Sequence, residues 1–242
     1  MSQNRLVLIS GKTTTGKSAA LRNLKNPEKV MYLNTESGKD LPFKNNFMSA
    51  KVIDPLQVPD AFVSAETMGD KVETIVVDSI TYLMDMYESL YVLPAADTMK
   101  GWSNFAQFFK GLLQKNCAES TKNVIMTGHT LTVFKDGEGG GDYETSVPIK
   151  GSLKNNGVES YFSMVISTKK VSLIELEKYK SPLLNITEEE EILGFKYVFQ
   201  TKITKDTVNE RIRAPMGMWS TAETFIDNDV QLVIDRLDEY YG

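Results

Sequence analysis

Short apolar runs alternate with longer amphipathic stretches along the first half of the chain. Runs rich in β-branched residues predict strands buried on both faces, and apolar residues three or four positions apart predict helices. The strands are expected near residues 5–10, 30–34, 51–53, 73–78 and 122–127. The helices are expected near residues 17–25, 58–68, 80–90 and 102–116. This order of elements predicts an α/β fold with a mostly parallel central sheet.

The pattern changes in the second half of the chain. Residues 134–148 are polar and rich in glycine, which predicts a loop. Two apolar segments, 157–179 and 189–204, predict antiparallel strands on either side of an acidic turn at residues 188–191. Residues 221–242 predict an amphipathic helix. The apolar residues of that helix are Val230, Val233, Ile234 and Leu237.

The bulk composition fits one globular domain. Apolar residues make up 41% of the 242 residues, which is enough for a hydrophobic core. We expect a single domain, with its core at about residues 5–130 and an antiparallel extension with a C-terminal helix at about residues 149–242. The net charge of −5 excludes a surface that is basic throughout, so any nucleic-acid contact must be local. A single cysteine, Cys117, allows no internal disulfide. No apolar run reaches the ~20 residues of a membrane span and no secretory signal begins the chain, so a cytoplasmic protein is expected.

Eight residues between the first predicted strand and helix have the pattern G-x-x-x-x-G-K-[ST], the phosphate-binding loop. They are Gly11, Lys12, Thr13, Thr14, Thr15, Gly16, Lys17 and Ser18. The glycines let backbone N–H groups point at an anion, and the following helix adds its positive end. Lys17 is expected on the β- and γ-phosphates and the Ser18 hydroxyl on Mg²⁺. The sequence therefore predicts ATP and Mg²⁺ as cofactors.

Three polar residues follow the other predicted strands, at the sheet edge where open α/β folds bind ligands. Asp78 is expected beside the phosphate loop, where it orients the water ligands of the metal with Ser18. Glu36 is expected to polarise the water that attacks the γ-phosphate. His129, the only histidine, is expected to contact the γ-phosphate and report its presence. The alternatives are a strand-ending aspartate, a solvated loop glutamate and a packed loop histidine without these roles.

Together the motifs resemble the RecA-like branch of phosphate-loop ATPases, over roughly residues 5–215. "TIVVDSI" is similar to the magnesium-site strand of that family, and "YLNTES" takes the place of its D-x-E phrase, so the resemblance implies that Glu36 is the catalytic base. RecA commonly has a glutamine sensor where "IMTGHT" has His129. The histidine at this position and the basic phrase "NERIRAP" instead resemble small phage nucleotide-binding proteins, the RecA-like single-strand annealing ATPases.

This resemblance implies an ATP-dependent protein that binds single-stranded DNA in phage recombination or annealing. It implies a ring or filament of identical subunits, with ATP·Mg²⁺ hydrolysed between them in the host cytoplasm. One DNA-binding loop is expected at residues 90–102, where Tyr91 and Trp102 would stack on bases and Lys100 would contact a phosphate. Packing of both aromatic rings in the core is the alternative.

A second DNA-binding loop is expected at residues 130–148, with Phe134 and Tyr143 as stacking groups. Its one lysine, Lys135, is outnumbered by four acidic residues, which disfavour contact with phosphates. These residues are Asp136, Glu138, Asp142 and Glu144.

Basic residues gather later in the chain, and one of them is expected to reach the γ-phosphate of a neighbouring subunit as an arginine finger. The basic residues are Lys150, Lys154, Lys169, Lys170, Lys202, Lys205, Arg211 and Arg213. Arg211 and Arg213 are expected two positions apart on one strand face, and either is a candidate, with Lys150 as a weaker one.

Two other classes of function remain open. A small-molecule kinase would use the same loop, but it would need an arginine-rich lid, and Arg22 is the only arginine between Arg5 and Arg211. A nucleotide-switched interaction protein, such as a helicase loader or assembly factor, would have no direct role on DNA. Its partner would be a helicase or a single-strand-binding protein, and the acidic charge balance favours it.

Overall fold

A computed structural model describes residues 5–135, 141–155 and 157–242. Its main sheet has the strand order β10-β9-β8-β1-β5-β4-β2-β3. The strands are β1 (Leu6–Gly11), β2 (Val30–Asn34), β3 (Met48–Lys51), β4 (Thr74–Asp78), β5 (Asn123–His129), β8 (Met164–Ser172), β9 (Phe195–Gln200) and β10 (Phe225–Asp227). The pairings from β8 through β3 are parallel, whereas β9 and β10 are added antiparallel. The predicted α/β fold with an antiparallel extension is confirmed.

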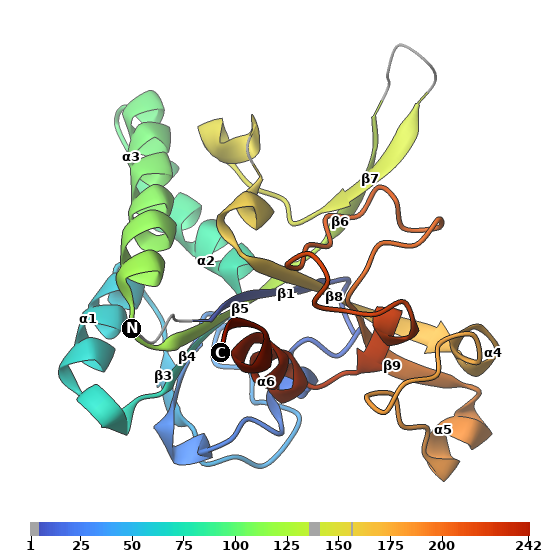
Figure 1. Ribbon diagram of the computed structural model, residues 1–242. Coiled ribbons are helices and arrows are strands. Elements are labelled where there is room, and N and C mark those ends of the chain that lie inside the picture. The colour runs from blue at the N-terminus through green and yellow to red at the C-terminus, as the bar shows by residue number, and fades with distance from the viewer. Residues whose placement is uncertain (1–4, 136–140, 156) are drawn as a thin grey trace.

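Helices cover both faces of this sheet (Figure 1). One face carries α1 (Gln57–Thr67), α2 (Ile80–Tyr87) and α3 (Thr98–Gly111), and the other carries α6 (Val230–Tyr241). The last turns of α2 and α3 continue as π-helical segments, Glu88–Val92 and Leu112–Cys117. Within the described ranges, no helix combines the length and the apolar character that crossing a bilayer requires.

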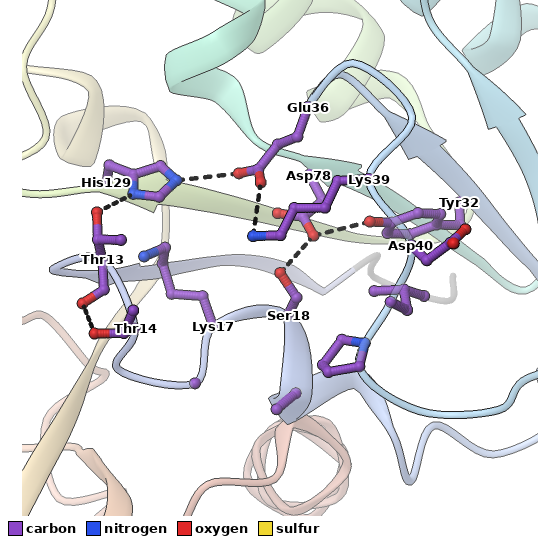
Figure 2. Close-up of a pocket in the computed structure, with 14 residues that line it drawn as sticks. Thr13, Thr14, Lys17, Ser18, Tyr32, Glu36, Lys39, Asp40, Asp78 and His129 are labelled. Atoms are coloured by element: carbon purple, nitrogen blue, oxygen red, sulfur yellow. Dashed lines mark hydrogen bonds and ion pairs between the residues drawn. The ribbon is translucent and has the colours of Figure 1, made fainter.

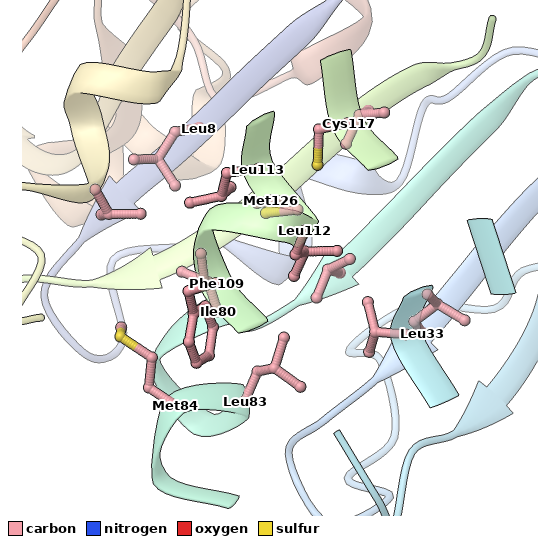
Figure 3. Close-up of a cluster of buried hydrophobic side chains, with 14 of the residues drawn as sticks. Leu8, Leu33, Ile80, Leu83, Met84, Phe109, Leu112, Leu113, Cys117 and Met126 are labelled. Atoms are coloured by element: carbon pink, nitrogen blue, oxygen red, sulfur yellow. The ribbon is translucent and has the colours of Figure 1, made fainter. Parts of the chain in front are cut away.

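The side chains of β1 alternate between the two cores. Leu8 packs under the α1–α3 layer with Ile80 and Phe109, as Figure 3 shows, while Val7 and Ile9 belong to the core beneath α6. All are fully buried, as a parallel strand covered on both faces requires. The expected apolar face of the C-terminal helix is confirmed, because Val230, Val233, Ile234 and Leu237 are all buried. The predicted start at residue 221 is wrong, because β10 occupies Phe225–Asp227 and the helix begins at Val230.

The helix predicted at residues 17–25 is wrong in its extent. The structure has only a 3-10 helix at Ser18–Leu21, continued by turns with i→i−3 hydrogen bonds. Asn26 has a φ of 49° and precedes Pro27, which disfavours helical backbone at the residue before it. A regular helix therefore cannot continue through this segment.

The acidic turn predicted between β8 and β9 is also wrong. Residues 188–191 form the first turn of α5 (Glu188–Leu193), and a second short helix, α4 (Leu173–Leu176), precedes it. The Thr187 side chain accepts a hydrogen bond from the Glu190 N–H, and the Glu190 side chain accepts one from the Thr187 N–H. This capping box, together with the positive N-terminal end of the helix, stabilises four consecutive glutamates.

The loop predicted at residues 134–148 is largely a β-hairpin. β6 (Leu131–Lys135) pairs with β7 (Asp142–Ser146) in a separate two-stranded sheet that projects from the body (Figure 1). Alternating β-branched and aromatic residues favour strands here despite the glycines. Asp136 and Glu138, which contributed to the predicted acidity, lie outside the described residues.

The strand predicted around Arg211 and Arg213 is not formed. This segment has only isolated bridges, between Thr145 and Glu210 and between Val165 and Arg213. The two arginines consequently contact different groups, Arg211 the Glu144 carboxylate and Arg213 the Ser160 carbonyl.

Candidate active site

The loops that follow β1, β2, β4 and β5 meet in one pocket of about 210 Å³ (Figure 2). The carboxyl ends of parallel strands share one edge of the sheet, and this is where α/β folds place ligands. The pocket is lined by Thr13, Thr14, Gly16, Lys17, Ser18, Ala19, Tyr32, Glu36, Lys39, Asp40, Leu41, Pro42, Asp78 and His129. The strand order therefore brings together the phosphate loop, Glu36, Asp78 and His129 as expected from the sequence.

The backbone of the phosphate loop has the geometry of an anion cradle. Gly16 has a φ of +94°, which favours glycine, and a side chain at Gly11 would lie 2.0 Å from Thr168 Oγ1. Within the described residues, the N–H groups of residues 13–17 donate to no other backbone group. These donors are available to the oxygens of a phosphate, so the loop fits the nucleotide that its pattern predicts.

Lys17 is folded back into its own loop. Its Nζ donates to the carbonyl oxygens of Gly11 at 3.1 Å and Lys12 at 2.8 Å, and the residue is only 6% exposed. Burial lowers the pKa of Lys17 to about 8, against the opposing attraction of the Asp78 and Glu36 carboxylates. A bound phosphate would supply the negative charge that this buried ammonium lacks.

Asp78 is the hub of a buried hydrogen-bond network. Its Oδ2 accepts from Ser18 Oγ at 2.8 Å and from Tyr32 Oη at 2.9 Å, and its Oδ1 accepts from Thr127 Oγ1. The predicted proximity of Ser18 and Asp78 is confirmed, whereas Tyr32 and Thr127 were not foreseen. Burial, followed by the Asp78 carboxylate, raises the pKa of Tyr32, so its hydroxyl remains a donor. This network fixes the rotamer of the carboxylate.

Ser18 and Asp78 are suited to Mg²⁺ rather than to a metal held by protein alone. Magnesium prefers oxygen ligands, keeps several waters and relies on substrate phosphates. No group of three or more His, Cys, Asp or Glu in the described part of the chain could hold a metal ion. The hydroxyl of Ser18 and the carboxylate of Asp78 would therefore hold Mg²⁺ together with the nucleotide and water.

The side chains of Glu36 and His129 point toward each other in the pocket (Figure 2). The His129 Nε2 and the Glu36 Oε1 are 3.0 Å apart, and Lys39 Nζ lies 3.9 Å from the other Glu36 oxygen. The hydrogen bond from His129, ahead of the opposing effect of burial, lowers the pKa of Glu36. The site thus contains an ionised carboxylate, which is the state that a general base requires.

The sheet register explains why His129 reaches the phosphate loop. His129 pairs with Gly11 at the end of β1, and its Nδ1 lies 3.5 Å from Thr13 Oγ1. The His129 N–H donates to Thr81 Oγ1 at 2.8 Å, and its ring makes an edge contact with Tyr82. Contacts from the phosphate loop and from α2 therefore orient this ring toward Glu36.

The three residues expected to reach the γ-phosphate of a neighbouring subunit do not line the pocket of their own chain. They are Arg211, Arg213 and Lys150. Arg211 pairs with Glu144 at 2.5 Å and with Glu159 at 3.3 Å. Lys150 pairs with Asp85 at 2.6 Å and with Glu88. The Arg213 side chain is exposed and donates to the Ser160 carbonyl at 3.4 Å.

The two expected DNA-binding loops differ in exposure. In the first, Tyr91 is partly buried and donates to Asp54 at 2.6 Å, and Trp102 packs against Phe105, in agreement with the core-packing alternative. In the second, Phe134 and Tyr143 are 51% and 62% exposed, with ring centroids 5.2 Å apart. Of these two segments, the hairpin is the one whose described residues include strongly exposed aromatic rings.

Comparison with known proteins places this geometry in a family. No curated protein matched the chain. A family model described as an AAA domain matches residues 3–207, most of the sequence and all the residues of the pocket. The chain therefore belongs to the AAA domain family of nucleotide-binding, phosphate-loop ATPase domains, in agreement with the RecA-like resemblance of its motifs.

Proposed function

We propose that this chain hydrolyses ATP with Mg²⁺ in the pocket, and that the nucleotide state controls the contact of its β6–β7 hairpin with single-stranded DNA. The observation that carries the proposal is the hydrogen bond between Glu36 and His129, because it joins the expected base to the residue that leads into β6. The proposed setting is an oligomer, a ring or filament, in phage recombination or annealing.

The phosphate loop and Lys17 bind the nucleotide in this proposal. Lys17 exchanges the carbonyl oxygens of Gly11 and Lys12 for phosphate oxygens, and the loop N–H groups hold the same anion. Ser18 and Asp78 hold Mg²⁺, which neutralises charge on the β- and γ-phosphates. Most of this catalysis is positioning and electrostatic stabilisation.

Glu36 acts as the general base. Its Oε1 takes the proton of the attacking water, and the lowered pKa keeps this oxygen ionised beforehand. While His129 donates to Oε1, that oxygen is less available to water. A γ-phosphate that accepts the His129 N–H would release Glu36 for catalysis, so base activation and nucleotide sensing are coupled.

His129 passes the nucleotide state to the hairpin through a short connection. It ends β5, and β6 starts two residues later at Leu131. Phe134 and Tyr143 are exposed on this hairpin and suit stacking on bases. Glu144 is paired with Lys135 and Arg211, which reduces the repulsion of phosphates by the acidic segment.

A protein partner is the second candidate for the hairpin. Leu131 and Val133 lie on the face opposite to Phe134 and are 54% and 46% exposed. An exposed apolar face is typical of a protein-binding surface. In this case the chain would be a nucleotide-switched loader or assembly factor, with a helicase or single-strand-binding protein as its partner.

Steady-state ATP hydrolysis with and without single-stranded DNA tests both candidates, with Lys17→Ala as the blank. The paired variants are Phe134→Ala/Tyr143→Ala and Leu131→Ser/Val133→Ser, which alter opposite faces of one hairpin. Loss of DNA stimulation in the first variant alone would support the DNA function. Hydrolysis that is indifferent to DNA would favour the protein partner, and absence of hydrolysis under every condition would contradict the ATPase proposal.

A further inference from the structure

The C-terminal segment, which lies beyond the family match, closes over the phosphate loop. The family model ends at residue 207, yet residues 228–235 contact residues 16–25 from more than 200 positions away. The contacts are Asn228 Nδ2 to Gly16 O at 2.8 Å, Arg22 Nη1 to Asn228 O at 2.7 Å, Asn23 Nδ2 to Asp229 Oδ2 at 2.6 Å, Lys25 N to Gln231 Oε1 at 2.9 Å and Lys25 Nζ to Asp235 Oδ1 at 2.7 Å. Only the Asn228 amide reaches the phosphate loop itself.

Two donors hold the carbonyl oxygen of Gly16. The Asn228 Nδ2 lies 2.8 Å from it, and the Ala20 N–H lies 3.0 Å from it. In a trans peptide the C=O and the next N–H point in opposite directions. Fixing the Gly16 carbonyl therefore also fixes the direction of the Lys17 N–H, which is one of the expected phosphate donors.

This peptide needs an anchor because Gly16 leaves it free to rotate. With a φ of +94°, Gly16 occupies a region in which glycine has many accessible conformations. A side chain at Gly16 would lie 2.5 Å from Asn228 Nδ2, so the loop cannot be made rigid there by a larger residue. Asn228 supplies from outside the loop the constraint that its sequence lacks.

A purely structural role explains Asn228 poorly. The residue is 4% exposed, and its Oδ1 has no hydrogen-bond partner among the described residues. Burying an unsatisfied amide oxygen is unfavourable for stability, and the packing of α6 would be better served by an apolar residue. Within the described residues, the one hydrogen bond of the side chain is to Gly16 O, so its contribution lies in the phosphate loop.

We propose that Asn228 is a positioning residue for nucleotide binding, which holds the Gly16–Lys17 peptide with the Lys17 N–H directed at the phosphates. The inference rests on the proposed binding of ATP in this pocket. Arg22 supports the arrangement by donating to the Asn228 carbonyl, so the anchor is held on both sides. The segment outside the family match thus completes the site.

The test compares the full chain with three variants. Calorimetry gives the dissociation constant of ATP·Mg²⁺ for each protein. KM, kcat and the melting temperature are measured on the same proteins. Asn228→Ala removes the donor, and Asn228→Asp keeps the shape but directs an acceptor at the Gly16 carbonyl. Lys25→Ala is the matched control, because it removes an outer contact of the same segment without touching the loop.

We expect Asn228→Ala to weaken ATP binding by about tenfold, since an orienting hydrogen bond is lost. Asn228→Asp should weaken it at least as much. Both should raise KM and leave kcat within about twofold, because phosphate binding is common to the ground state and the transition state. Lys25→Ala should bind ATP as the unaltered chain does, even where its melting temperature falls.

Two results would overturn the inference. One is unchanged ATP affinity in either folded Asn228 variant, with Asn228→Asp deciding if the alanine variant does not fold. The other is an equal loss of affinity in Lys25→Ala, which would assign the effect to general docking of the C-terminal segment. A failure of the unaltered chain to bind ATP would instead contradict the proposed function.

Discussion

Glu36 accepts a hydrogen bond from His129 across the pocket, with 3.0 Å between Oε1 and Nε2. The two residues are 93 positions apart: Glu36 follows β2 and His129 ends β5, and β4 lies between these strands in the sheet. In the proposed mechanism, this contact joins the general base, Glu36, to a residue that restrains it.

Replacing Glu36 with glutamine should abolish most hydrolysis and leave nucleotide binding intact. The amide keeps the size of the side chain but cannot take a proton from water. We expect kcat to fall by about 10²-fold or more, with a dissociation constant for ATP within a few-fold of the original. Glu28→Gln, at an exposed glutamate, is the matched control. Retention of more than a tenth of the activity would exclude Glu36 as the base.

The pH dependence of kcat should change when His129 is replaced by alanine. The hydrogen bond from His129 holds the pKa of Glu36 below its ordinary value, so Glu36 stays ionised down to more acidic pH. Without the imidazole this pKa should rise, and the acid limb of the kcat profile should move to higher pH.

The same shift affects stability with a definite sign. A carboxyl with a lowered pKa stabilises the folded state above its unfolded pKa of about 4.3, and the stabilisation is lost as pH falls through the folded value. The unaltered chain should therefore lose more stability than His129→Ala on acidification below about pH 4.5. Chemical unfolding at several pH values measures this difference, and parallel curves for the two proteins would argue against the pair.

Lys17 should make the nucleotide-free protein more stable as pH rises above 8. Its pKa is about 8 in the folded chain and about 10.4 in an unfolded one, so the unfolded state binds more protons between these values. We expect a gain of roughly 1–3 kcal/mol in unfolding free energy between pH 7.5 and 9.5, relative to Lys17→Met. Urea unfolding provides the measurement, and an equal response in the methionine variant would show that other groups are responsible.

ATP binding should also take up protons near pH 8.5, because phosphate favours the charged form of Lys17. Calorimetry in buffers of different ionisation enthalpy detects this uptake. Lys12→Ala serves as the comparison, since Lys12 is an exposed lysine of the same loop. Uptake that persists at lower pH, where Lys17 is already protonated, would assign the protons elsewhere.

Removing the Tyr32 hydroxyl should weaken the response to Mg²⁺. Tyr32→Phe deletes one of the three donors to Asp78 and leaves its carboxylate less firmly oriented. We expect the Mg²⁺ concentration for half-maximal hydrolysis to rise several-fold, consistent with ~1 kcal/mol for one hydrogen bond. Tyr241→Phe, at an exposed tyrosine at the end of α6, is the control. An unchanged Mg²⁺ titration would contradict this role.

Alanine substitutions at Arg211 and at Arg213 should have different effects on stability. Arg211→Ala leaves the buried Glu159 without its ion pair to Arg211, removes one of the two ion pairs of Glu144, and should lower the unfolding free energy by roughly 1–3 kcal/mol. Arg213→Ala breaks only one long contact, so its stability should change by less than about 0.5 kcal/mol.

If Arg213 acts on a neighbouring subunit, its alanine variant should still assemble but hydrolyse ATP at least tenfold more slowly. Mixing this variant with Lys17→Ala should then restore part of the activity, because each subunit supplies what the other lacks. Normal hydrolysis by assembled Arg213→Ala would exclude Arg213 and leave Arg211, with Lys150 as the weaker candidate.

The sequence by itself determined the parts of this protein that depend on neighbouring residues. The phosphate loop is a local pattern whose glycines and hydroxyls have fixed spacing, and α6 shows its buried face in its own periodicity. Asp78 and Glu36 were found because polar residues that end buried parallel strands must meet at one sheet edge. In two places a local signal was overridden by another local effect, by Asn26 and Pro27 after the loop and by the Thr187 capping box before β9.

Only the tertiary structure decided which distant side chains converge on those residues. Tyr32 and Thr127 reach Asp78 from two other strands, and Asn228 reaches Gly16 across 212 positions. Arg211 is held by Glu144 and Glu159 instead of standing on a strand with Arg213. Such pairs follow from strand order and from the docking of the C-terminal segment. Spacing along one chain carries no information about them, because many partners of the same chemistry are available to each polar group.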